Sequence, residues 1–205
     1  MLPVNTYVIW DEQTREAAVI DAGCYYPAEC NILKQFITDE GLTVKHLLNT
    51  HLHFDHIFGN RFIYEQYGLK TCAHRADEEW LTDAPRRTRM FGLEFPGAPV
   101  PIGTYLDEGD ELTLGSHTLK CIHVPGHSQG SLVFYSPEAG CLFAGDVLFQ
   151  GSIGRTDLPG GDHQTLLDGI RTKLFALPDD TVVYSGHGGQ TTIGYEKQYN
   201  FYLKY

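Results

Sequence analysis

The sequence predicts an α/β protein whose sheets come from two similar halves of the chain. Short segments rich in β-branched and aromatic residues alternate with helical patterns. Two hairpins share one layout: a strand, a polar turn, a second strand, and then an aspartate beside a glycine. Several strands end in small residues followed by a histidine or an aspartate, where α/β sheets usually bind ligands. The length of 205 residues fits a single domain, residues 1–205.

The first half begins with a predicted hairpin and helix. Residues 5–10 ("NTYVIW") are rich in β-formers, "DEQT" is a turn, and "EAAVIDAG" predicts a second strand. Residues 27–41 predict a helix that starts with a proline. Its apolar residues Ile32, Phe36 and Ile37 recur on one side, so we expect that side to pack.

A short apolar strand then leads into a loop rich in histidine. Residues 44–50 ("VKHLLNT") predict the strand, and "HLHFDH" follows it directly. Residues 59–68 predict the next helix and residues 69–74 the next strand. Residues 75–101 contain several prolines and predict a surface helix followed by a long loop.

The second half repeats this alternation. Residues 111–126 predict a hairpin that runs toward a histidine, and residues 130–146 predict a second hairpin that ends at an aspartate. Residues 162–178 predict a helix and residues 181–189 a strand that ends at another histidine. Residues 193–205 predict a helical tail.

Charge and cysteine content exclude several classes of protein. The formal net charge of -11 repels phosphate, so we expect no nucleic-acid partner and no anionic membrane partner. Five cysteines without a CxxC pair argue against a disulfide framework and indicate a reducing compartment. The N-terminal stretch "MLPVNTYVIWDE" lacks the pattern of a signal peptide or a membrane span, so we expect a cytoplasmic protein.

Seven side chains at strand ends are candidate metal ligands: His51, His53, Asp55, His56, His127, Asp146 and His187. In an extended segment His51 and His53 point the same way, so they can chelate one ion. Imidazole and carboxylate without thiolate suit zinc, iron or manganese. The set is large enough for two ions, with the two oxygens of Asp146 as a natural bridge, and such a pair can generate hydroxide at neutral pH. We interpret His123 as a strand-packing residue and His74 as a surface or core histidine.

The motifs "THLHFDH", "PGHSQGS", "FAGD" and "SGHG", in this order, resemble the metallo-β-lactamase superfamily. The resemblance spans nearly the whole chain. It implies a four-layer αββα sandwich with its site at one edge between two mixed sheets. It also implies one role for each candidate. The first ion is held by His51, His53 and His127, and the second by Asp55, His56 and His187. Asp146 bridges the ions, and Asp21 orients a ligand without binding metal.

The segment "GSIGRTDLPGGD" (residues 151–162) is similar to short glyoxalase II-like thioesterases and also to persulfide dioxygenases. The tail "TTIGYEKQYN" favours the first group. We do not expect the helical C-terminal region with which eukaryotic-type enzymes contact glutathione. The resemblance implies a hydrolase for a small-molecule thioester such as S-lactoylglutathione, in which a metal-bridging hydroxide attacks and Asp55 is the catalytic residue that accepts its proton. Two divalent ions are expected, with zinc favoured and iron or manganese as alternatives.

Two other functions stay open at this point. A mononuclear iron persulfide dioxygenase would use only part of the ligand set, and a metal-stabilised binding protein would use it without catalysis. Arg155 has two interpretations of equal weight. It binds a carboxylate of the substrate, or it pairs with Asp157 and fixes its own loop. The sequence does not indicate an oligomeric state.

Overall fold

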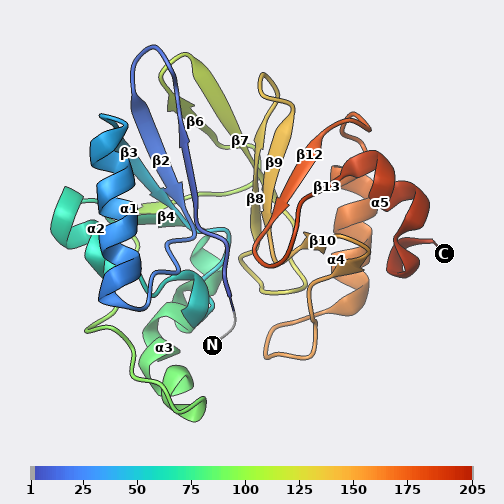
Figure 1. Cartoon of the computed structure of the whole chain (residues 1–205). Coiled ribbons are helices and arrows are strands. Elements are labelled where there is room, and N and C mark those ends of the chain that lie inside the picture. The colour runs from blue at the N-terminus through green and yellow to red at the C-terminus, as the bar shows by residue number, and fades with distance from the viewer. Residues whose placement is uncertain (1–2, 205) are drawn as a thin grey trace.

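Two mixed β-sheets lie between two outer layers of helices in the computed structural model, which describes residues 3–204 (Figure 1). Helices α1 and α2 cover the sheet of the N-terminal half, with α3 below it, and α4 and α5 cover the sheet of the C-terminal half. This confirms the four-layer αββα sandwich.

The N-terminal sheet has the strand order β1-β2-β3-β4-β5. Its first pair is an antiparallel hairpin, and the remaining pairs are parallel. The strands are β1 (Tyr7–Trp10), β2 (Glu16–Ile20), β3 (Thr43–Leu48), β4 (Thr71–Ala73) and β5 (Thr104–Tyr105). The helices of this half are α1 (Pro27–Asp39), α2 (Asn60–Tyr67) and α3 (Glu78–Met90), with the short 3-10 turns η1 (Phe54–His56) and η2 (Arg75–Asp77).

The C-terminal sheet has the strand order β13-β12-β9-β8-β7-β6. Its strands are β6 (Glu111–Leu114), β7 (His117–His123), β8 (Leu132–Ser136), β9 (Cys141–Gly145), β12 (Val182–Ser185) and β13 (Thr191–Thr192). A separate small hairpin joins β10 (Leu148–Phe149) to β11 (Ser152–Ile153). The helices are α4 (His163–Gly169), α5 (Ile193–Tyr199), the π-helical turn η3 (Ile170–Leu174) and the 3-10 turn η4 (Phe201–Leu203).

The two halves share one structural unit, as the repeated sequence layout indicates. In the first half the hairpin β1–β2 is followed by α1 and then by β3, which pairs parallel to β2. In the second half the hairpin β8–β9 is followed by α4 and then by β12, which pairs parallel to β9. Each hairpin is followed by an aspartate, Asp21 or Asp146, and each parallel strand leads to a histidine, His51 or His187. The repeat therefore places matching functional groups at matching strand ends.

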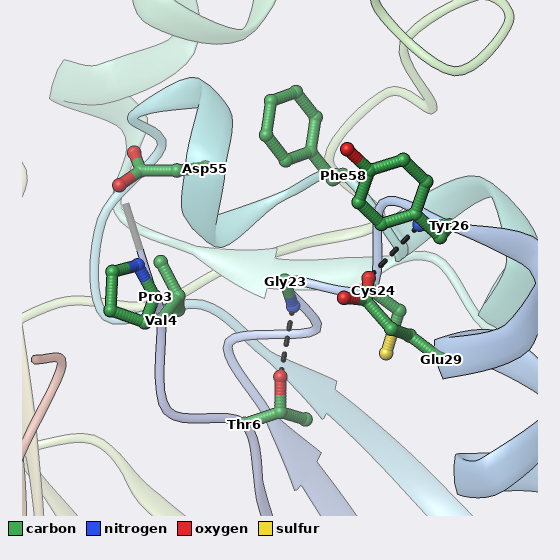
Figure 2. A pocket seen from close by; sticks show the side chains of 9 residues that line it. All are labelled: Pro3, Val4, Thr6, Gly23, Cys24, Tyr26, Glu29, Asp55 and Phe58. Atoms are coloured by element: carbon green, nitrogen blue, oxygen red, sulfur yellow. Dashed lines mark hydrogen bonds between the residues drawn. The ribbon is translucent and has the colours of Figure 1, made fainter. Parts of the chain in front are cut away.

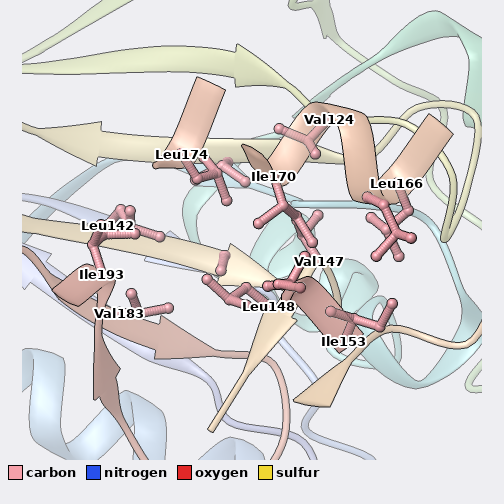
Figure 3. Close-up of a cluster of buried hydrophobic side chains, with 14 residues drawn as sticks. Val124, Leu142, Val147, Leu148, Ile153, Leu166, Ile170, Leu174, Val183 and Ile193 are labelled. Atoms are coloured by element: carbon pink, nitrogen blue, oxygen red, sulfur yellow. The ribbon is translucent and has the colours of Figure 1, made fainter. Parts of the chain in front are cut away.

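Alternation along the strands fills three layers of core. In β8, Leu132 and Phe134 point into the cluster between the two sheets, whereas Val133 points to the cluster beneath the outer helices. Leu166 and Ile170 close this outer cluster from the helical side (Figure 3). Because both faces of the strand are buried, its sequence is an apolar run and not a polar–apolar alternation.

The predicted packing face of α1 is wrong in part. Leu33 and Ile37 are buried against the sheet, whereas Ile32 is 70% exposed and Phe36 is 38% exposed. The helix carries two apolar stripes of i, i+4 spacing, offset by about 100°. Only one stripe can face the sheet, so the stripe of Ile32 and Phe36 lies at the surface.

Other boundaries differ from the sequence prediction for local reasons. The helix predicted over residues 162–178 begins at His163, because the Asp162 side chain accepts a hydrogen bond from the Thr165 N–H and caps it. It widens into the π-helical turn after Gly169. The tail is helical but breaks at Asn200, and Tyr205 lies outside the described residues.

All five cysteines are free, as their spacing predicts: Cys24, Cys72 and Cys121 are buried, and the remaining two are half-buried. None of the helices described for residues 3–204 is both long enough and apolar enough to cross a bilayer.

The two stripes of α1 predict unequal effects of the same substitution. Ile37→Ala removes buried methyl groups and should lower the free energy of unfolding by about 2–5 kcal/mol. Ile32→Ala lies on the exposed stripe and should change it by less than about 0.5 kcal/mol. Urea denaturation of both variants measures the difference, and equal losses would show that the exposed stripe is packed in solution.

Candidate metal centre

The seven candidate ligands meet in the loops that follow the strands. His51, His53, Asp55 and His56 lie between β3 and α2, His127 follows β7, Asp146 follows β9 and His187 follows β12. The four histidines His51, His53, His56 and His127 are buried. The side chains of Asp55 and Asp146 are each 13% exposed, and that of His187 is 24% exposed. Segments more than a hundred residues apart thus form one polar cluster at the edge between the sheets.

The first group consists of His51, His53 and His127. The Nε2 atom of His127 lies 3.3 Å from Nε2 of His51 and 3.0 Å from Nδ1 of His53. Nitrogens that bind one tetrahedral zinc ion at ordinary distances lie about 3.3 Å apart. The three rings therefore already have the spacing of ligands to a single ion.

Hydrogen bonds behind these rings fix which nitrogen faces the cluster. Nδ1 of His127 lies 2.8 Å from the carbonyl oxygen of Arg155, which can only accept, so Nδ1 donates and Nε2 keeps its lone pair. Burial lowers the pKa of His53 to about 3 and also lowers the pKa of His51 and of His127. Neutral imidazoles are the form that binds metal.

The second group consists of Asp55, His56 and His187 and is held together by charge. Nε2 of His187 lies 3.5 Å from Oδ2 of Asp55, and Nδ1 of His187 donates to the Pro3 carbonyl oxygen at 2.6 Å. Burial alone would lower the pKa of His56, but the carboxylates of Asp146 and Asp21 raise it well above its usual value. These carboxylates attract positive charge to this half of the cluster.

Asp146 lies between the two groups. Its Oδ1 is 3.4 Å from Nε2 of His56, and its Oδ2 is 3.5 Å from Nε2 of His187 and 3.6 Å from Nε2 of His127. A Cβ atom on Gly186 would collide with Oδ1 of Asp146, so only glycine lets the backbone pass so close. This position is the one expected of a bridging carboxylate.

The cluster has unsatisfied polar atoms of the kind that a cation satisfies. Among the described residues, Nε2 of His56 and Oδ1 of Asp146 are buried and face each other at 3.4 Å, but neither has a hydrogen bond of good geometry. A buried polar atom without a partner costs about 1–3 kcal/mol. Both atoms are good ligands for a divalent ion, so the residues present fit a metal centre.

Asp21 lies behind the candidate ligand His56 and contacts its ring. Its Oδ1 accepts from the backbone N–H of Thr50 at 2.8 Å, and its Oδ2 accepts from the Thr50 hydroxyl at 2.6 Å. Nδ1 of His56 lies 3.0 Å from the same Oδ2, so Nε2 of His56 is turned toward the cluster. The backbone of Asp21 has a left-handed conformation, with φ of 50°. Both oxygens of its side chain already accept hydrogen bonds. This geometry fits an orienting role.

Asp77 is a candidate positioning residue that the sequence reasoning missed. Its buried Oδ2 accepts from the N–H of Leu52 at 3.1 Å and from the Ser128 hydroxyl at 2.8 Å, and Oδ1 accepts from the N–H of Gly130 at 2.7 Å. Leu52 separates the first two histidines of the cluster, and Ser128 follows His127. One carboxylate therefore ties together the two loops that carry the first group. Its position at the start of α3 suggests an N-cap, yet its side chain makes no capping bond.

Arg155 contributes its main chain to the cluster, through the carbonyl that holds His127. Its exposed side chain forms two hydrogen bonds of 2.7 Å with the carboxylate of Asp157. That pairing is the second of the two interpretations made from the sequence. Binding of a substrate carboxylate by Arg155 stays a prediction.

A separate cluster joins His74, Asp107 and His123, whose donor atoms lie within 4.8 Å of one another. The two imidazole rings stack with centroids 4.1 Å apart and planes inclined by 12°. Lone pairs in stacked rings run side by side and do not converge on one point. Nδ1 of His74 also accepts from the Ala76 N–H, and Nε2 of His123 faces the Gln129 carbonyl. These contacts fit packing and not metal binding.

Substitution of Asp77 should lower the affinity for metal although all the candidate ligands remain. In Asp77→Asn one carboxylate oxygen is replaced by an NH₂ group, which cannot accept a hydrogen bond. It would face a donor that the carboxylate now binds, such as the Gly130 N–H. The free energy of unfolding should fall by about 1–3 kcal/mol, and the affinity of the first ion by about 10- to 100-fold. Chelator competition measures the affinity. Asp168→Asn, which removes the same charge from an exposed position on α4, should leave it unchanged. Equal affinities for all three proteins would contradict this role of Asp77.

Comparison with known proteins agrees with this geometry. Residues 1–187 match the family model described as the metallo-beta-lactamase superfamily. The chain is 39% identical to the hydroxyacylglutathione hydrolase GloC of Haemophilus influenzae over 97% of this chain and 92% of that protein.

Two solved structures are similar over nearly their whole length. The BLEG-1 B3 metallo-beta-lactamase has a TM-score of 0.86 and 37% identity over 98% of this chain and 95% of that chain. The protein TTHA1623, solved in a di-iron-bound form, has a TM-score of 0.86 and 37% identity over 98% of this chain and 96% of that chain. The fold, the ordered motifs and these matches together support a dinuclear metal site, and the chain belongs to the metallo-β-lactamase superfamily.

Proposed function

We propose that the protein is a metal-dependent hydrolase that cleaves a thioester of the S-lactoylglutathione type. The observation that carries the proposal is the convergence of two ligand groups on Asp146. A relative named as a hydroxyacylglutathione hydrolase, 39% identical over nearly the whole chain, supports the thioester as substrate. The five free cysteines agree with a reducing compartment such as the cytoplasm.

In this proposal His51, His53 and His127 would hold one ion, Asp55, His56 and His187 would hold the other, and Asp146 would contribute to both. Two bound divalent ions supply a Lewis acid for the substrate carbonyl and lower the pKa of water. Zinc is favoured, and iron or manganese also suits imidazole and carboxylate donors. The di-iron form of TTHA1623 supports iron as an alternative.

Asp55 is the residue of this chain that we assign to proton transfer. Burial alone would raise the pKa of its carboxyl group, but the hydrogen bond with His187 lowers it, so the group is ionised at neutral pH. Asp55 also lines a cavity of about 390 Å³ (Figure 2). A carboxylate at the border of a cavity can orient an attacking water and accept its proton.

The competing functions account less well for the second group. A mononuclear oxygenase would leave Asp55, His56 and His187 without a shared role, although their ligand atoms lie within 4.8 Å of one another. A metal-stabilised binding protein needs a closed ligand shell, whereas the cavity gives a small molecule access to Asp55.

Metal content separates these functions. Elemental analysis of the purified protein should find two divalent ions per chain, and His187→Ala should lose one of them. Removal of metal by a chelator should lower the melting temperature. Metal restored to 1,000 times its Kd should raise the free energy of unfolding by about 4.1 kcal/mol per site. One ion per chain in the intact protein would favour the oxygenase.

Activity tests the reaction itself. The fully metallated protein should hydrolyse S-lactoylglutathione, and His51→Ala should lower kcat/KM by more than the 10- to 100-fold typical of residues that only orient ligands. His163→Ala, which removes an exposed histidine at the start of α4, serves as the control.

Two results would overturn the proposal. One is the absence of hydrolysis with any 2-hydroxyacyl thioester. The other is oxygen consumption with glutathione persulfide in place of hydrolysis.

A further inference from the structure

Asp55 of the second ligand group borders a cavity, whereas His56 and His187 are not among its lining residues. Figure 2 shows Asp55 and Phe58 in its upper part, with Val4 below Asp55 and Gly23 below Phe58. Pro3, whose carbonyl receives the N–H of His187, also lines it. A molecule in this cavity therefore contacts the same loops that hold two of the candidate ligands.

A second cavity of about 420 Å³ adjoins the first. The two share Thr6, Cys24 and Glu29 as lining residues. From there the second cavity follows β1 and α1, and its far part is lined by Ile32 and Phe36 together with other apolar side chains. We call the two cavities together the β1–α1 trough.

The exposed apolar stripe of α1 lines the far part of the trough, where it could contact a ligand. Ile32 is 70% exposed and Phe36 is 38% exposed, and neither packs in the core between α1 and its sheet. Pockets for small molecules are lined mainly by apolar side chains with a few polar groups at one end. The trough has this arrangement, with Asp55 at the polar end.

The negative charge of the trough favours the acyl chain of a thioester over an anionic thiol carrier. In the described part of the chain no lysine, arginine or histidine lines either cavity, and the charged lining residues are the carboxylates Asp55 and Glu29. Oε2 of Glu29 already accepts from the backbone N–H groups of Tyr25 and Tyr26 at 2.8 and 2.9 Å. A thiol carrier with carboxylate groups, such as glutathione, would meet like charge here. An uncharged hydrocarbon chain would not.

We propose that the β1–α1 trough binds the acyl chain of the thioester, so that the preferred substrates carry extended apolar acyl groups. This inference rests on the proposed thioester hydrolysis and names its substrate class. The acyl carbon lies at the Asp55 end, and the hydrocarbon chain runs between β1 and α1 toward Ile32. The thiol carrier lies outside the trough.

A series of acyl glutathione thioesters with two to ten carbons tests the inference. Each methylene that enters the trough should raise kcat/KM by about fourfold until the trough is full. A value of kcat/KM that stays flat or falls with chain length would overturn the inference, while the hydrolysis itself would still support the proposed function.

Substitution at the far end of the trough tests where the chain lies. Ile32→Lys places a cation where the hydrocarbon would pack, so the ratio of kcat/KM for the ten-carbon to the two-carbon thioester should fall at least tenfold. Gln35→Lys adds a charge to the same helix at an exposed position outside both cavities and should leave the ratio unchanged. Equal ratios in all three proteins would place the chain elsewhere. Urea denaturation confirms that each variant is folded.

Binding without hydrolysis separates the two proposals. S-octylglutathione and S-methylglutathione are thioethers that cannot be hydrolysed, and calorimetry measures their Kd directly. The octyl compound should bind at least tenfold more tightly to the natural protein, and Ile32→Lys should remove that gain. If the octyl compound binds more tightly but no thioester is hydrolysed, the proposed function is overturned and the trough is not. Hydrolysis with no octyl gain would overturn the trough alone.

Discussion

The carboxylate of Asp146 is the group on which the rest of the site depends. Burying a carboxylate is costly unless other charges and hydrogen bonds compensate. Here His56, His127 and His187 approach it from three different loops, and they hold its pKa below the usual range although burial would raise it. The glycine that precedes it has a φ of 50°, and a side chain there would collide with Thr50. The end of β9 is thus shaped to present one carboxylate to two groups of ligands.

A repeated unit explains how such different segments meet. Each half supplies a hairpin that ends near an aspartate and a parallel strand that leads to a histidine. When the two sheets pack face to face, the corresponding strand ends lie along one edge. The repeat is not symmetric in chemistry: Asp21 turns its oxygens to Thr50 and His56, whereas Asp146 turns them to the ligand groups. One aspartate therefore contacts a single candidate ligand, His56, and its counterpart lies between the two ligand groups.

Much of this organisation could be predicted from the sequence, because strand-end motifs are local patterns. The histidine-rich loop, the hairpins and the helix after Asp162 follow from short-range residue chemistry. The packing face of α1 could not be predicted, since periodicity identifies two stripes but not the one that meets the sheet. The role of Asp77 was also hidden, because its three partners lie 25 to 53 residues away. In sequence it is only an acidic residue at a helix start, where a cap is the default expectation.

The contact between His187 and the carbonyl of Pro3 joins residues 184 positions apart. Asn5 strengthens this junction, because its side-chain amide donates to the carbonyls of Ser185 and Gly188. Closing a loop of this length costs more entropy than closing a shorter one. The histidines of the first group can gather earlier, because the last of them is only 76 residues from the first. We therefore expect the first ligand group to form earlier in folding than the second. The second group is complete only when the segment of Pro3 and Asn5 reaches the loop that carries His187.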